Sequence, residues 1–151
     1  LMGISLGGGG ALNYAREHPA QIEGVIVLAP FLATTGTIAE VVRAGGWSDW
    51  NEGAHDADDD ERRLLAWIKA YRSDIPRMPK IYLGYGTDDR FVAASELLSQ
   101  RLPPQHVVTM AGGHDWPTWS NLWRALLQQD LFARDKLAPR TIAHPASNVT
   151  P

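Results

Sequence analysis

Short apolar runs along the chain predict three β-strands. They lie at residues 24–29, 80–85 and 106–110, and all three are rich in the residues that favour strands, such as valine, isoleucine and tyrosine. The first run is apolar on both faces, which is typical of a parallel strand buried within a sheet.

Helical periodicity predicts four helices, at residues 10–17, 60–72, 93–102 and 117–132. In the second, one stripe at helical spacing is apolar and consists of Leu64, Leu65, Trp67, Ile68 and Tyr71. The fourth starts with Pro117. Proline is favoured in the first turn of a helix, where a backbone N–H would have no hydrogen-bond partner within the helix. Since strands and helices alternate, we predict the fold class α/β, with parallel strands, flanking helices and right-handed crossovers.

One segment interrupts this alternation. Residues 34–77 form a long excursion between the first two strands, rich in glycine and tryptophan at its start and acidic at 55–61. We interpret it as a lid-like insertion, in which Trp47 and Trp50 either cover a substrate or pack beneath the loop. The acidic residues lack the spacing of a calcium-binding loop, so we expect a solvated loop and no metal ion.

The composition excludes several classes of protein. A chain with 44% apolar residues and six tryptophans is not disordered, and a net charge of −3 argues against a nucleic-acid partner. No apolar run approaches the roughly 18 residues that a membrane span needs. The absence of cysteine excludes disulfides, thiolate metal sites and cysteine nucleophiles. We therefore expect one globular domain over residues 1–135, followed by a loose tail over 136–151.

The opening residues contain a candidate nucleophile. The segment Gly3-Ile4-Ser5-Leu6-Gly7 matches G-x-S-x-G, a turn that presents a serine between a strand and a helix. Glycines flank the serine in this turn because its backbone is strained and its neighbours approach closely. Glycine continues to Gly10, which is costly inside a helix unless the backbone must pack closely or approach a ligand. An ordinary glycine-rich turn is the alternative.

Two further loops contain a candidate acid and a candidate base. Asp88 and Asp89 follow the second predicted strand, and His114 follows the third. Because ligand sites of parallel sheets lie at the carboxyl ends of the strands, we expect these side chains to meet Ser5 at one edge. The order serine, acid, histidine is the one that α/β-hydrolases use. The alternative for His114 is a loop histidine that caps the following helix.

With these three motifs in order, the chain resembles the C-terminal half of an α/β-hydrolase-fold serine esterase or lipase. The ending Gly113-His114-Asp115-Trp116 is similar to that of the esterase-D-like branch. The resemblance implies that Ser5 is the nucleophile, His114 the base and the backbone N–H of Leu6 an oxyanion donor. It favours Asp89 over Asp88 as the acid, because the family's spacing is counted from Gly86. It implies no cofactor and no metal.

The resemblance also implies a small-molecule ester or related acyl substrate. The same triad serves peptidases, thioesterases and acyltransferases, so these chemistries remain alternatives. A binding module of the same fold is a further alternative, although a pure binder has no need of an intact serine, aspartate and histidine.

The beginning of the chain departs from the family. The fold normally places four or five strands before the elbow, together with the loop that supplies a second oxyanion donor, whereas here only two residues precede Gly3. On this ground we expect a fragment or truncated chain, which could be non-catalytic. We also expect the 24–29 strand to expose a hydrophobic sheet edge and to favour self-association.

Overall fold

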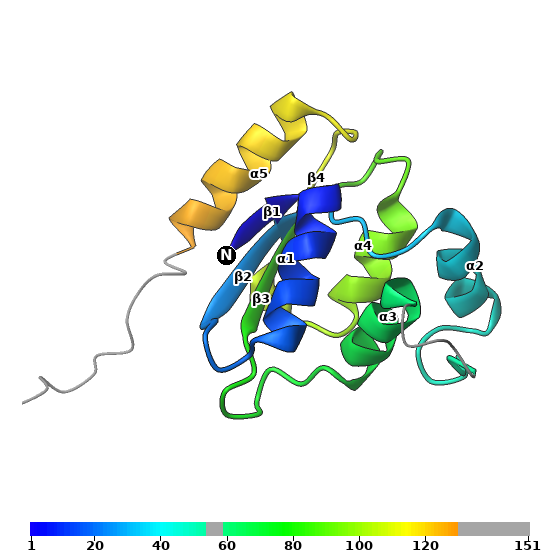
Figure 1. Ribbon diagram of the computed structural model, residues 1–151. Helices are drawn as coiled ribbons and strands as arrows, with labels where there is room; N and C mark the ends of the chain where they lie inside the picture. Colours follow the sequence, from blue (N-terminus) through cyan, green and yellow to red (C-terminus); the bar gives the residue numbers. More distant parts are fainter. Residues whose placement is uncertain (54–58, 130–151) are drawn as a thin grey trace, which may run out of the picture.

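The computed structural model describes residues 1–53 and 59–129. Four parallel strands form the sheet, in the spatial order β1 (Met2–Ile4), β2 (Gly24–Leu28), β3 (Lys80–Gly86) and β4 (Val107–Met110) (Figure 1). Strands that follow one another in the sequence are also adjacent in the sheet and parallel. Each connection between them therefore returns along the sheet to the start of the next strand. This arrangement confirms the predicted fold class and the three predicted strands, whose ends differ from expectation by one residue.

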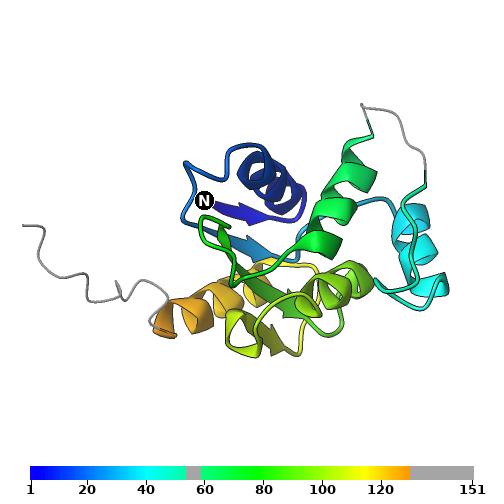
Figure 2. The same cartoon turned by 90° about the horizontal axis from the view of Figure 1, so that it is seen from below.

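Helices follow the strands in turn. They are α1 (Leu6–Glu17), α2 (Thr35–Arg43), α3 (Asp60–Ala70), α4 (Val92–Ser99) and α5 (Trp116–Gln128), with a short 3₁₀ turn at Pro104–His106. Helix α5 covers one face of the sheet, while α1, α3 and α4 cover the other (Figure 1). Both views place α2 outside α3 and α4, at the side of the molecule away from the sheet (Figures 1 and 2).

Apolar side chains fill the space on both faces of the sheet. The larger cluster, under α1, α3 and α4, includes Leu12, Val27, Leu65, Leu83 and Leu98. The smaller cluster, under α5, consists of Ile26, Leu28, Leu122 and Leu126. Because successive residues of a strand point to opposite faces, the continuous apolar run of β2 supplies both clusters. The prediction that this strand is buried on both faces is therefore confirmed.

The strand at the edge of the sheet differs from the one that the sequence analysis predicted. Strand β1 pairs with β2 along Met2↔Ile26, Gly3↔Val27 and Ile4↔Leu28, and the carbonyl of Leu1 also accepts a hydrogen bond from the Ile26 N–H. The expectation that the 24–29 strand exposes a sheet edge is wrong, because β1 covers it. The outer strand is β1 itself, and self-association through its edge stays a prediction.

Helices α3 and α4 end two and three residues before their predicted ends, and two other helices differ more from the predicted pattern. Helix α1 begins at Leu6, four residues earlier than expected, so that the glycine run lies inside it. Helix α2 was not predicted, since Gly36 and several β-branched residues give its sequence a low helix propensity. Contacts with the rest of the fold compensate: Ile38 and Val41 are buried in the main core. In addition, the Glu61 carboxylate of α3 accepts hydrogen bonds from the backbone N–H and hydroxyl of Thr34 and from the hydroxyl of Thr37. Helix α5 ends at Gln128 with Gln129 as its C-cap, earlier than the predicted end at residue 132, and residues 130–132 lie outside the described residues.

The two tryptophans of the excursion are part of the core. Trp47 and Trp50 are 5% and 3% exposed, and the indole N–H of Trp47 donates a hydrogen bond of 2.8 Å to the carbonyl of Leu97 at the end of α4. Of the two interpretations left open, the structure supports packing beneath the loop. That residues 34–77 act as a lid stays a prediction.

Two rings near the start of β3 have perturbed acidities. The buried hydroxyl of Tyr71 donates to the carbonyl of Pro79 at 3.0 Å, and burial raises its pKa. The imidazole of His106 lies 3.1 Å from the carbonyl of Ile81 through Nδ1 and 4.4 Å from the Tyr82 ring. Burial lowers the pKa of His106, because the charged form loses its hydration.

The lowered pKa of His106 predicts a loss of stability in mild acid. In the unfolded chain this residue binds a proton near pH 6.5, whereas the folded ring stays neutral to a lower pH. Between the two values the unfolded state holds more protons, so the free energy of unfolding falls as the pH falls. We expect a lower urea midpoint at pH 5.5 than at pH 7.5, and a smaller difference in His106→Asn. Equal pH dependence in both proteins would contradict this assignment.

Candidate active site

Ser5 lies in a strained turn between β1 and α1. Its backbone has φ 51° and ψ −121°, a conformation that costs a residue other than glycine about 1–3 kcal/mol. Four hydrogen bonds hold it: its N–H donates to the carbonyl of Leu28, and its own carbonyl accepts from the N–H groups of Gly8, Gly9 and Phe31. The turn is thus fastened to β2, to α1 and to the loop after β2, and Ser5 stands where the strand gives way to the helix.

Close backbone packing explains two of the glycines. A Cβ atom at Gly3 would lie 2.2 Å from the carbonyl oxygen of Gly7, and one at Gly9 would lie 2.0 Å from that of Phe31. By contrast, a Cβ atom at Gly10 would meet nothing within 4 Å. The predicted close approach of backbone to backbone therefore explains Gly9 but not Gly10 within the glycine run.

The structure brings Ser5, His114 and Asp89 together. The hydroxyl of Ser5 lies 2.8 Å from Nε2 of His114, and Nδ1 of the same ring lies 2.7 Å from Oδ2 of Asp89. The side chains of His114 and Asp89 are 11% and 2% exposed, so solvent screens this pair little. With the proton on Nδ1, the imidazole donates to Asp89 and leaves Nε2 free to accept the Ser5 proton.

Asp88 lies next to this chain of hydrogen bonds but has another partner. Its carboxylate accepts the N–H of Gly112 at 3.0 Å, and its own N–H donates to the Gly112 carbonyl at 3.0 Å. These two bonds join the loop after β3 to the loop after β4. Asp89, in contrast, also accepts the N–H of Phe91 at 2.8 Å and is 4% exposed. Of the two aspartates that the sequence left open, Asp89 is the one that meets His114.

Aromatic rings flank the histidine on two sides. The rings of Phe91 and Trp119 lie 5.1 Å and 5.0 Å from that of His114, both nearly perpendicular to it. Such edge-to-face contacts restrict the rotation of the imidazole. Sequence reasoning did not predict these contacts. The available signal was position: Phe91 follows Asp89 by two residues, and Trp119 lies in the first turn of the helix after His114, whose cap is the Asp115 carboxylate.

A small apolar pocket opens beside Ser5 and His114. Its volume is about 70 Å³. Its buried lining consists of Ala29, Pro30, Leu32, Ala33, Ile38 and Ala94, and its exposed lining of Phe31, Thr35, Arg90, Phe91 and Ala93. The candidate oxyanion donor, the N–H of Leu6, belongs to the first residue of α1, and the first N–H groups of a helix have no partner within it. An acyl group and a developing negative charge can therefore both be accommodated beside Ser5.

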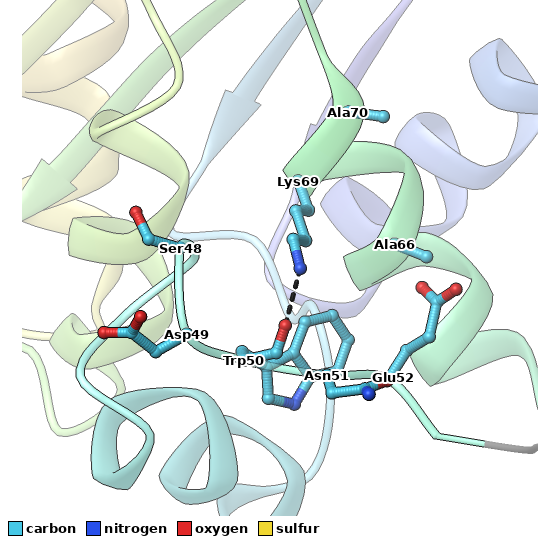
Figure 3. A pocket seen from close by; sticks show the side chains of 8 residues that line it. All are labelled: Ser48, Asp49, Trp50, Asn51, Glu52, Ala66, Lys69 and Ala70. Carbon is cyan, nitrogen blue, oxygen red and sulfur yellow. Dashed lines mark hydrogen bonds between the residues drawn. The ribbon is translucent and has the colours of Figure 1, made fainter.

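A larger, open hollow of about 730 Å³ lies elsewhere, between α3 and the segment that follows α2 (Figure 3). It shares no lining residue with the pocket of Ser5. The amino group of Lys69 donates to the carbonyl of Trp50 at 2.5 Å and lies 5.8 Å from the centre of its ring, so this cation already holds the segment in place. We infer that this hollow has a structural role only.

Two further expectations concern metals and membranes. Within residues 1–53 and 59–129, no group of three or more histidine, aspartate or glutamate side chains could hold a metal ion. Residues 55–58 of the acidic segment lie outside the described residues. Across the same described ranges, no helix is long and apolar enough to span a bilayer.

The parallel sheet, the turn at Ser5 between β1 and α1 and the convergence of three loops are features of the α/β-hydrolase fold. Residues 1–133 match the family described as "Putative esterase", and the chain belongs to this family. No curated protein matches the chain. Among solved structures, a ferulic acid esterase is similar to it, with 21% identity and a TM-score of 0.55 over 85% of this chain and 49% of that one. This likeness supports the fold.

Two other solved structures are similar at lower TM-scores. An S-formylglutathione hydrolase from Staphylococcus aureus has 19% identity and a TM-score of 0.49, over 85% of this chain and 49% of that one. A monoacylglycerol lipase from Paleococcus ferrophilus has 19% identity and a TM-score of 0.46, over 85% of this chain and 66% of that one. The chain thus spans about half the length of the first two structures.

The close approach at Gly9 predicts opposite effects of alanine at two neighbouring positions. Gly9→Ala places a methyl group against the Phe31 carbonyl, so we expect the free energy of unfolding to fall by about 1–3 kcal/mol. Gly10→Ala adds a methyl group in open space within the same helix, and we expect a rise of about 0.5–1 kcal/mol. Urea unfolding measures both. Equal effects of the two substitutions would contradict the packing argument.

Proposed function

We propose that the chain cleaves an ester or related acyl bond of a small-molecule substrate through an acyl-enzyme on Ser5. The observation that supports this proposal most directly is the continuous set of hydrogen bonds from Ser5 through His114 to Asp89, with distances of 2.8 Å and 2.7 Å. Membership of the esterase family favours an ester over an amide. The apolar pocket beside Ser5 suits the hydrocarbon part of such a substrate.

The first half of the proposed reaction forms the acyl-enzyme. His114 accepts the hydroxyl proton at Nε2 while Ser5 Oγ attacks the carbonyl carbon, and Asp89 stabilises the imidazolium that results. The N–H of Leu6 donates to the oxyanion, and one such donor is typically worth about 2.7–4 kcal/mol. His114 then returns the proton to the leaving alkoxide, the carbon–oxygen bond breaks and an alcohol departs.

The second half releases the acid. Water takes the place of the alcohol, gives a proton to His114 Nε2 and attacks the acyl carbon. The new tetrahedral intermediate collapses, Ser5 Oγ leaves and recovers the proton, and a carboxylic acid is produced. The side chains of Ser5, His114 and Asp89 already lie within hydrogen-bonding distance of one another, and the proposed cycle uses no metal or organic cofactor.

Covalent labelling with a fluorophosphonate tests this proposal. We expect a single adduct, found by intact mass and assigned to Ser5 by peptide mapping, and none in Ser5→Ala or His114→Ala. These reagents require an activated serine and not a particular substrate, so the result does not depend on guessing the ester. A folded protein, verified by circular dichroism, that takes up no label would contradict the proposal.

The two neighbouring aspartates provide a matched pair for the acid. Asp89→Asn leaves the shape intact but removes the charge beside His114, and we expect the labelling rate and kcat to fall by roughly 10³–10⁴-fold. Asp88→Asn keeps an oxygen that can accept the Gly112 N–H, so we expect a change of only a few-fold. A deeper loss in Asp88→Asn than in Asp89→Asn would show that the acid is assigned to the wrong residue.

A further inference from the structure

We infer, on the basis of the proposed function, that the pocket beside Ser5 admits one short apolar chain of the ester and excludes a long one. Ile38 and Ala94 set the length limit. The inference concerns the size of the substrate and the residues that select it, and it rests on the volume, the lining and the anchoring of this pocket.

The volume sets the length. A water molecule takes up about 30 Å³ in the liquid, and a methylene group is close to it in size. The pocket of about 70 Å³ therefore holds a chain of a few carbons beside Ser5, and a chain of eight or more exceeds it.

The lining sets the chemistry. The floor consists of side chains without charge or hydrogen-bonding groups, among them Leu32, Ala33, Ile38 and Ala94, all 6% exposed or less. The guanidinium of Arg90 lies at the exposed mouth, over the ring of Phe91 at 4.7 Å from its centre. A charged chain would lose its hydration against this floor and gain no partner there, so the floor selects hydrocarbon.

The core behind the pocket explains why the limit is firm. Ile38 and Ala94 belong to the main apolar cluster, which also contains Trp47 and Leu97. Protein cores are close-packed, so a longer chain could enter only by displacing these side chains. Helix α2, which carries Ile38, is also held from outside: the Glu61 carboxylate bonds its first turn, and Arg62 pairs with Glu40 at 2.7 Å.

The test is a chain-length profile of the full 151-residue chain, measured as kcat/KM. One series keeps the p-nitrophenyl group and varies the acyl chain from acetate through butyrate and octanoate to dodecanoate. The other keeps the acetyl group and varies the alcohol over the same lengths. Each methylene that enters the pocket contributes about fourfold to kcat/KM. In one of the two series we therefore expect kcat/KM to rise up to the four-carbon chain and to fall at least tenfold from the four-carbon to the eight-carbon chain.

Two substitutions should move the limit in opposite directions. In Ala94→Leu the added side chain occupies the floor, and we expect the four-carbon preference to be lost by at least tenfold relative to acetate. In Ile38→Ala the floor recedes, and we expect the optimum to shift towards octanoate. Ala70→Leu adds the same side chain at an exposed site outside the pocket, and its profile should match that of the parent protein.

Labelling by a small methyl fluorophosphonate separates folding and catalysis from chain length. Normal labelling with a displaced limit supports the inference, and the series that shows the limit identifies whether the acyl or the alcohol chain enters. Normal labelling with no length limit in either series, or with Ala94→Leu reducing all lengths alike, overturns it. If the parent protein neither labels nor hydrolyses any ester, the proposed function fails, and this inference fails with it.

Discussion

The backbone of Ser5 is the constraint on which the rest of the site depends. A residue with a side chain rests at φ 51° only when its surroundings hold it there, and four backbone hydrogen bonds do so. They join the end of β1, the start of α1, the end of β2 and the loop at Phe31. The same bonds therefore place the serine and bring Phe31 so near to α1 that only glycine fits at Gly9. The position of Ser5 and the close packing of α1 therefore depend on the same hydrogen bonds.

The other two members of the site depend on the parallel sheet. Because β3 and β4 run in the same direction, the loops that leave them meet at one edge, and Asp88 joins these loops through Gly112. Phe91 restricts both side chains of the Asp89–His114 pair. Its N–H donates a hydrogen bond to the Asp89 carboxylate, and its ring packs against the His114 imidazole. The hydrogen bonds to Ser5 thus form within a frame that the backbone has already built.

Features that depend on local sequence signals could be predicted, whereas features that depend on contacts between distant residues could not. Three of the four strands, and the three side chains that meet at the site, could be picked out because β-branched runs and motif spacing are local signals. Helix α2 could not, since the contacts that hold it come from distant residues, such as the hydrogen bond between Thr34 and Glu61, 27 residues apart. Nor could the pairing of β1 with β2, because a three-residue strand carries almost no periodicity. The sequence favoured Asp89 over Asp88 only through the spacing of the family's motif. The contact between Asp89 and His114 gives the physical reason.

The pocket and the triad are held by different parts of the molecule. Strand ends and the elbow position Ser5, Asp89 and His114, whereas one wall of the pocket depends on α2 and its attachment to α3. Both helices belong to the excursion between β2 and β3, in which α3 packs on the sheet and α2 lies outside α3 and α4. Changes in this segment can therefore alter the space beside the serine while the hydrogen bonds of the triad stay in place. Under the proposed function, this separation allows the size of the substrate to change while the arrangement of Ser5, His114 and Asp89 is kept.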